Sequence, residues 1–203
     1  MRHWFDFLFP PRADEAVLRG VSKDEFLARM APRLVPETRP STVALFSFGD
    51  ACVRAAIHEA KYHGSTQAFE FLAAALSEYL READDVGPRR SYIIPIPLGS
   101  ERLRERGFNQ AEEIVKRDAE ELGMTIDTTL LTRTRETGSQ VGLPREKREK
   151  NMQGAFRATR PADSSRTYIV FDDVITTGAT LQAAIDALRD AGATHIVPLA
   201  LAH

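Results

Sequence analysis

Cysteine is almost absent from the 203-residue chain, in which Cys52 is the only one. One thiol cannot build a disulfide framework, and it cannot supply a cysteine-based zinc ribbon within one chain. Both stabilising devices are therefore excluded, and the composition is typical of a protein in a reducing compartment. We expect a cytoplasmic location.

Long apolar runs and an excess of charge are also missing. No stretch reaches the roughly 20 apolar residues that a membrane helix needs. The aromatic segment 1–10 is interrupted by Asp6 and is shorter than the core of a signal peptide. Lys and Arg number 27 against 29 Asp and Glu, which gives a formal net charge of -2. We therefore expect no membrane partner and no general attraction to nucleic acid, so any anion site must be local.

Strands that alternate with amphipathic helices are the main pattern that the chain does contain. Such alternation predicts an α/β fold with a mainly parallel, twisted sheet flanked by helices. We assign this domain to residues 42–203 and treat residues 1–41, with one capped helix at 22–30, as a small N-terminal appendage. The predicted helices are 50–62, 69–80, 109–122 and 181–188, and the predicted strands are 91–97, 168–171 and 195–201.

The segment 168–181 carries the clearest chemical signal. An apolar strand is followed by Asp172 and Asp173, then by a small, hydroxylated turn and a helix. Ligands of parallel sheets bind at the carboxyl ends of strands, so the two carboxylates can accept hydrogen bonds from vicinal ribose hydroxyls. The turn and the helix N-terminus favour a phosphate, with Gly178 allowing close backbone approach. The predicted phosphate cradle consists of Thr176, Thr177, Gly178, Ala179 and Thr180.

A simpler interpretation is that Asp and Thr side chains only cap the helix. One cap accounts for Thr177 or Thr180, but it does not account for two consecutive acids followed by this turn. A phosphatase of the haloacid dehalogenase type needs its second Asp two positions after the first, where the chain has Val174. No Walker P-loop string occurs either. Together, diol and phosphate recognition fit one ribose 5-phosphate.

An arginine-rich stretch lies between the predicted strand 91–97 and the helix that starts near Asn109. Cations and a helix N-terminus converge there, which suits a diphosphate. The alternative is a solvated loop whose arginines pair with Glu101 and Glu105. The residues predicted to bind the anion are Arg102, Arg104, Arg106 and Asn109.

A second basic stretch lies in the segment 132–156, which has no clear apolar period. Residues 133–150 contain six Lys or Arg and three Glu, so this part is locally basic. A connection of this length in a compact domain is either a functional loop or a disordered one. Both interpretations stay open at this point.

The segment 169–181 resembles the phosphoribosyl diphosphate motif of type I phosphoribosyltransferases. From roughly residue 48 to 203, further motifs resemble in order and spacing the ComF family, also called GntX or amidophosphoribosyltransferase-like. These motifs are 94–97, 102–111, Gln140 with Leu143, 148–151 and 154–156. Many family members carry an N-terminal four-cysteine zinc ribbon. This chain keeps the family-like residues 8–11 but has Ala, Asp and Glu afterwards, so the ribbon is absent.

The resemblance implies a type I phosphoribosyltransferase fold that binds phosphoribosyl diphosphate, with Mg²⁺ held through the substrate diphosphate and not directly by the protein. It also implies that 102–106 is the pyrophosphate-binding loop and that 133–150 is the flexible catalytic loop. For some family members it implies a role in DNA uptake during competence.

The expected reaction is displacement at the anomeric carbon by an unidentified nitrogen acceptor, with pyrophosphate leaving. Asp172 and Asp173 would hold the ribose diol, and Arg148 or Lys147 would reach the leaving group. One alternative is a sensor or competence accessory that binds the ligand without turnover. Another is a DNA-handling module, which the net charge and the missing ribbon disfavour. The oligomeric state is open, and a homodimer is one option.

Overall fold

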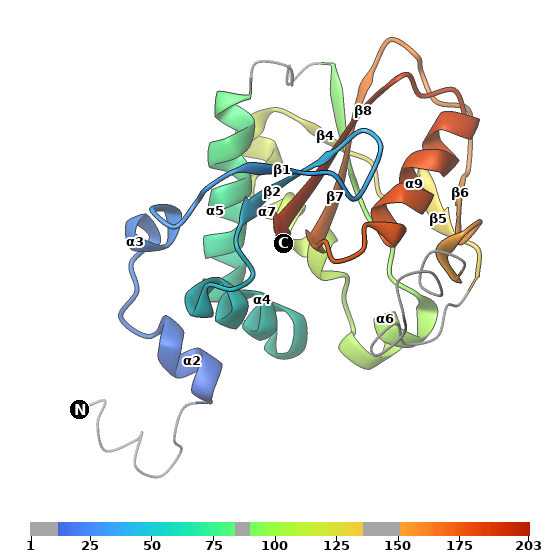
Figure 1. Cartoon of the computed structure of the whole chain (residues 1–203). Coiled ribbons are helices and arrows are strands. Elements are labelled where there is room, and N and C mark those ends of the chain that lie inside the picture. The colour runs from blue at the N-terminus through green and yellow to red at the C-terminus, as the bar shows by residue number, and fades with distance from the viewer. Residues whose placement is uncertain (1–11, 84–89, 136–150) are drawn as a thin grey trace.

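A mostly parallel sheet of six strands forms the centre of the described chain (Figure 1). The structure is a computed structural model, and it describes residues 12–83, 90–135 and 151–203. The strand order is β1-β2-β8-β7-β3-β4, and only the β1–β2 pair is antiparallel. The strands are β1 (Arg33–Val35), β2 (Thr42–Phe46), β3 (Ser91–Pro95), β4 (Thr125–Ile126), β7 (Thr167–Val174) and β8 (His195–Ala202). The α/β class with a mainly parallel, helix-flanked sheet is thus confirmed.

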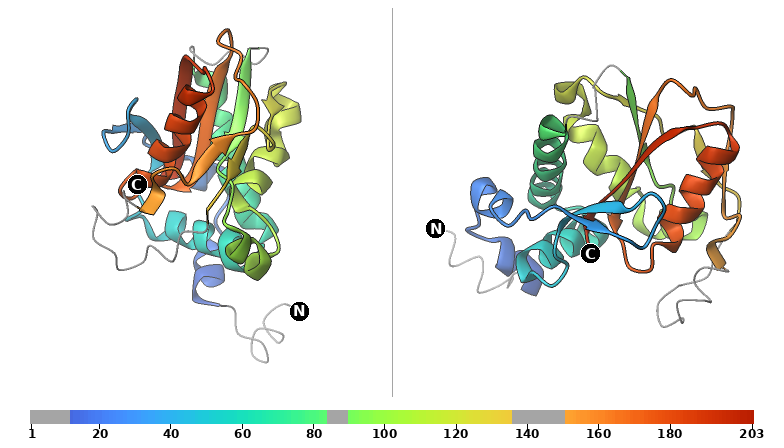
Figure 2. Two further views of the ribbon diagram at one scale, coloured as in Figure 1. Left: turned by 90° about the vertical axis from the view of Figure 1, so that its right-hand side faces the viewer. Right: turned by 45° about the horizontal axis from the view of Figure 1, so that its top comes forward.

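Helices cover both faces of this sheet. Helices α4 (Ala51–His63), α5 (Thr66–Glu82) and α7 (Gln110–Leu122) lie on one face, and α9 (Ala179–Asp190) lies on the other. In the left view of Figure 2 the strands lie between α9 and α7. Because side chains alternate along a strand, Ile169 and Phe171 enter one hydrophobic cluster, and Tyr168 and Val170 enter the other.

Polar caps begin the helices on the first face. The Asp50 carboxylate accepts hydrogen bonds from the backbone N–H groups of Cys52 and Val53, at 2.8 and 3.2 Å, and so starts α4. The same helix ends at Gly64, whose φ of 60° is left-handed. The predicted helix 50–62 is therefore confirmed. None of the described helices is long and apolar enough to span a membrane.

Several short elements were not expected from the sequence, and three of them lie in the two basic stretches or at their ends. The arginine-rich stretch contains helix α6 (Ser100–Arg106), which has no apolar period because Leu103 is its only apolar residue. The ends of the aperiodic segment 132–156 also meet, since β5 (Leu131–Arg133) pairs antiparallel with β6 (Phe156–Ala158). This two-stranded sheet packs against α9.

The N-terminal segment packs on the sheet. It contains α2 (Ala13–Leu18), α3 (Lys23–Leu27) and β1, which forms one edge of the sheet. The Phe26 ring is fully buried between Phe46 and Phe71, with ring centroids 5.2 and 4.9 Å away. The described residues of this segment thus share the core of the sheet, whereas a domain boundary at residue 41 stays a prediction from composition.

Candidate functional site

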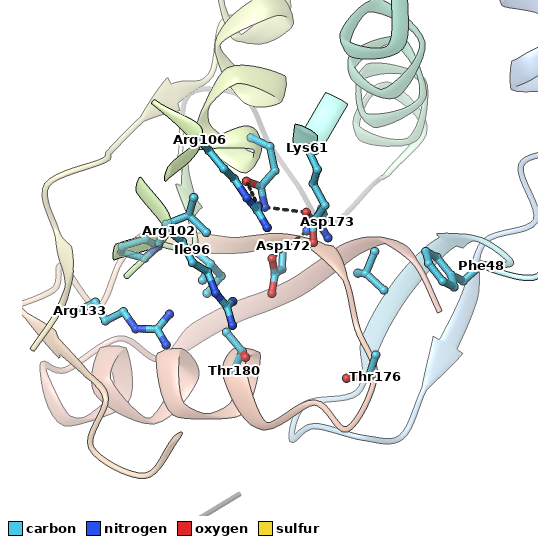
Figure 3. Close-up of a pocket in the computed structure, with 14 residues that line it drawn as sticks. Phe48, Lys61, Ile96, Arg102, Arg106, Arg133, Asp172, Asp173, Thr176 and Thr180 are labelled. Carbon is cyan, nitrogen blue, oxygen red and sulfur yellow. Dashed lines mark hydrogen bonds and ion pairs between the residues drawn. The ribbon is translucent and has the colours of Figure 1, made fainter. Parts of the chain in front are cut away.

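A cavity of about 400 Å³ opens where β2, β3 and β7 end (Figure 3). This is the edge at which parallel sheets bind their ligands. One cavity therefore brings together residues from both predicted sites, the acidic strand end and the arginine-rich stretch. The lining residues are Phe48, Lys61, Ile96, Pro97, Leu98, Arg102, Arg106, Gln110, Arg133, Asp172, Asp173, Val174, Thr176 and Thr180.

The acidic pair lies within the last part of β7, which is longer than the predicted strand because β8 continues to pair with it up to Val174. Neighbouring side chains of a strand point to opposite faces, and the two carboxylates accordingly diverge (Figure 3). Asp173 is only 5% exposed. Its Oδ2 atom lies 2.8 Å from Lys61 Nζ and accepts a hydrogen bond of 2.7 Å from Gln110 Nε2.

Asp172 has a different environment. Its Oδ1 atom accepts a hydrogen bond of 2.9 Å from the backbone N–H of Asp173, and no described side chain is hydrogen-bonded to it. Burial, together with the neighbouring charge of Asp173, raises the pKa of Asp172 to about 7. The carboxyl group therefore exchanges a proton near neutral pH and is available to ligand hydroxyls.

The turn after β7 leads directly into α9. Its N-cap is Gly178, and no side chain among the described residues caps the helix. This finding contradicts the interpretation that the Asp and Thr residues are there to cap α9. The first N–H groups of a helix lack partners within the helix, so they are free to bind an anion. A pocket of about 20 Å³, enough for roughly one group of the size of a water molecule, adjoins this turn. It is lined by Asp172 and by residues 174–181, which include Thr177 and Ala179.

Gly178 has a left-handed backbone conformation that favours glycine in this turn. Its φ is 72°, and an added Cβ would lie 2.5 Å from the Glu37 carbonyl oxygen in the β1–β2 connection. The missing side chain therefore permits the left-handed turn and its contact with Glu37. The close approach of a phosphate to Gly178 stays a prediction.

The three arginines of α6 do not share one direction. Arg102 and Arg106 are four residues apart, lie on one face of the helix and line the cavity. Arg104 lies two residues from each, is exposed, and donates to the Ser100 carbonyl at 3.4 Å. It is not among the lining residues.

Asn109 also lies outside the cavity lining. Its Nδ2 donates to the Ile96 carbonyl at 2.9 Å, and its Oδ1 accepts from the Ala111 N–H at 3.1 Å. It thus ties the start of α7 to the end of β3. Lys147 and Arg148, predicted for the catalytic loop, lie outside the described residues.

The sequence analysis did not single out three lining residues, Lys61, Gln110 and Phe48. Lys61 lies in the last turn of the predicted helix 50–62, where a cation is common. Gln110 was included only as part of the motif 102–111. The links of Lys61 and Gln110 to Asp173 depend on the positions of α4 and α7 over β7, for which no local pattern exists.

Comparison with known proteins gives moderate similarities. No protein-family profile matches the chain. Over 127 residues it is 35% identical to the DNA utilization protein YhgH of Salmonella typhi, covering 62% of this chain and 56% of that protein. Over 106 residues it is 33% identical to competence protein F of Haemophilus influenzae, covering 51% and 46% of the two chains.

A third relative is competence protein ComFC of Bacillus subtilis, which is 31% identical over 125 residues, covering 61% of this chain and 49% of that protein. The chain thus spans about half the length of the relatives that it matches. It is similar, at moderate identity, to competence and DNA utilization proteins, which supports the resemblance to the ComF family.

Proposed function

We propose that the protein is a phosphoribosyltransferase that binds phosphoribosyl diphosphate with Mg²⁺ and transfers the ribose 5-phosphate to a nitrogen acceptor. One observation carries the proposal. The turn before the uncapped N-terminus of α9, the Asp172 carboxylate and the two same-face arginines of α6 all meet at one cavity. A helix N-terminus can bind a phosphate, a carboxylate can accept hydrogen bonds from a sugar diol, and a pair of arginines can bind a diphosphate.

Each part of the ligand can be assigned to residues that line the cavity or the adjoining turn. The 5-phosphate suits the turn at residues 176–180, where the first N–H groups of α9 have no side-chain cap. The ribose hydroxyls suit Asp172, which lines the same small pocket as Thr180. The diphosphate suits Arg102 and Arg106. A volume of about 400 Å³ is in the ordinary range for a small-molecule site.

The proposal also includes Mg²⁺. Among the described residues there is no group of three or more His, Cys, Asp or Glu side chains that could hold a metal ion. In the proposal Mg²⁺ is held through the oxygens of the substrate diphosphate, a common way for this ion to bind in enzymes that act on phosphates. When bound, the ion would neutralise charge on the leaving pyrophosphate.

The proposed reaction breaks the bond between the anomeric carbon and the pyrophosphate oxygen. The acceptor nitrogen supplies an electron pair to that carbon and then loses a proton, and the electrons of the broken bond leave with pyrophosphate. Arg102 and Arg106 would stabilise the charge that gathers on the leaving group. Asp172 would stabilise the positive charge that develops on the sugar. Arg148 and Lys147 keep their predicted roles in excluding water and reaching the leaving group.

The test is to incubate the whole chain with phosphoribosyl diphosphate, Mg²⁺ and a panel of nucleobases, ammonia and amines. We expect pyrophosphate release that depends on one acceptor and falls at least tenfold in Asp172→Asn, roughly 1.4 kcal/mol or more. Binding of phosphoribosyl diphosphate is measured in parallel by calorimetry. Absence of both binding and release would contradict the proposal.

A second candidate is a protein that binds this ligand without turnover and takes part in competence or DNA use. The names of the similar proteins favour it, since they refer to competence and DNA utilization. The same experiment separates the two candidates. Tight binding without pyrophosphate release from any acceptor would favour the second.

A further inference from the structure

We infer that Asp173 is a positioning residue that fixes Arg106 through Gln110, so that Asp172 is the only member of the acidic pair to contact the ligand. This inference rests on the proposed function. It differs from the expectation that both carboxylates hold the ribose diol.

A closed ring of contacts links the residues concerned, of which Figure 3 labels Asp173, Lys61 and Arg106. Asp173 Oδ2 accepts from Gln110 Nε2 at 2.7 Å and pairs with Lys61 Nζ at 2.8 Å. Gln110 Oε1 in turn accepts from Arg106 Nη1 at 2.8 Å. The Arg106 guanidinium carbon lies 5.1 Å from the centre of the Tyr62 ring. Tyr62 follows Lys61 on α4, so the series of contacts that begins at Lys61 ends at its neighbour on the same helix.

Asp173 lines the cavity but offers little exposed surface to a sugar. It is 5% exposed, and one of its oxygens already accepts from two donors on two helices. Turning this carboxylate toward a ligand would leave the Lys61 ammonium without its counter-charge in a largely buried position, and breaking such a pair is strongly unfavourable. Asp172, in contrast, has no described side chain to release.

The charge of Asp173 also decides the orientation of the Gln110 amide. A carboxylate can only accept hydrogen bonds, so the NH₂ group of Gln110 must face Asp173. Its carbonyl oxygen then faces Arg106, which can only donate. Gln110 is 3% exposed, so little solvent competes for either bond. The negative charge of Asp173 thus orients the Gln110 amide so that its carbonyl oxygen is the acceptor for Arg106.

The consequence for binding is preorganisation. Arg106 is held from one side by the Gln110 oxygen and from another by the Tyr62 ring while it lines the cavity. An arginine that is already ordered loses less side-chain entropy when it binds an anion. Loss of the ring of contacts should therefore weaken the binding of a diphosphate, although neither Asp173 nor Tyr62 touches it.

The experiment measures two fragments of the ligand separately by calorimetry. Inorganic pyrophosphate with Mg²⁺ reports on Arg106, and ribose 5-phosphate reports on the sugar and the 5-phosphate. We expect Asp173→Asn and Tyr62→Leu each to weaken pyrophosphate binding about three- to tenfold, and to leave ribose 5-phosphate binding within about twofold. In an Arg106→Ala background the same substitutions should have no further effect on pyrophosphate binding.

Tyr62→Phe is the matched control, because it keeps the aromatic face under Arg106 and should bind pyrophosphate as wild type does. Tyr62 is 57% exposed. Tyr62→Leu therefore tests the inference even if Asp173→Asn fails to fold.

The outcomes separate this inference from the proposed function. If Asp173→Asn weakens ribose 5-phosphate binding and leaves pyrophosphate binding unchanged, Asp173 contacts the sugar and the inference is wrong. Unchanged pyrophosphate binding in Tyr62→Leu, with both fragments bound by wild type, also overturns the inference but leaves the proposed function standing. Failure of wild type to bind either fragment overturns both.

Discussion

At the scale of single residues, the raised pKa of Asp172 makes the stability of the folded protein depend on pH. The ordinary pKa of Asp172 is 3.8, and burial with the adjacent Asp173 charge raises it to about 7 in the folded protein. The folded state therefore binds this proton more tightly than the unfolded state. The resulting stabilisation is fully present below about pH 4 and is lost as the pH rises through about 7.

We expect Asp172→Asn, which cannot ionise, to escape this loss. Its stability relative to wild type should rise by about 1 to 2 kcal/mol between about pH 5 and about pH 8, a figure reduced for the partial exposure of the group. Urea unfolding at both pH values measures this difference. A constant difference across the two pH values would mean that Asp172 does not titrate in this range.

Gly178 allows a second prediction at this scale. We expect Gly178→Ala to destabilise the fold by at least about 2 kcal/mol, because a left-handed φ is strained for Ala and the new Cβ would meet the Glu37 backbone. Gly20→Ala is the matched control, since Gly20 has a φ of 82° but no atom within 4 Å of an added Cβ. It should cost only the conformational strain of about 1 kcal/mol.

Thermal unfolding of the two variants compares these costs directly. If both variants lose the same stability, the contact with Glu37 has no energetic weight. The turn would then need Gly178 for its dihedral angle alone.

At the scale of elements, the rotation of α6 separates three arginines that the sequence presents as equivalent. Arg102 and Arg106 face the cavity, and Arg104 does not line it. We expect Arg102→Ala and Arg106→Ala each to weaken pyrophosphate binding about tenfold or more, the loss of a charge-assisted contact. Arg104→Ala should change it less than about twofold. Equal losses for all three variants would show that the anion senses only the summed charge of α6.

Strand β7 shows a similar effect of geometry. Adjacent residues of a strand point to opposite faces, so one carboxylate meets Lys61 and Gln110 and the other remains open. The sequence presents Asp172 and Asp173 as a pair. The element that carries them gives them different environments.

At the scale of the whole molecule, the described N-terminal segment belongs to the core. Phe26 has no exposed surface and contacts rings from β2 and α5. We expect Phe26→Ala to lower the free energy of unfolding by about 3 to 5 kcal/mol. Val17, which is 42% exposed, is the control, and Val17→Ala should change stability by about 0.5 kcal/mol or less. A loss below about 1 kcal/mol for Phe26→Ala would show a segment that is only loosely attached.

Local patterns in the sequence predict several of the helices and strands. The helix capped by Asp50, the strand before Asp172 and the alternation of strands with helices follow from apolar period and cap chemistry. The same local signal located the turn and the start of α9. These features depend on residues within a few positions of one another, so a linear pattern contains them.

Which residues share the site depends on the packing of segments that are distant in the sequence. Lys61 reaches Asp173 because α4 crosses the end of β7, and Arg133 reaches the cavity because β5 packs near α9. Helix α6 and strand β1 are too short to carry a clear period, so packing and strand pairing define them. The physical reason is that contacts between distant segments depend on how elements cover the sheet, which no local pattern of side chains specifies.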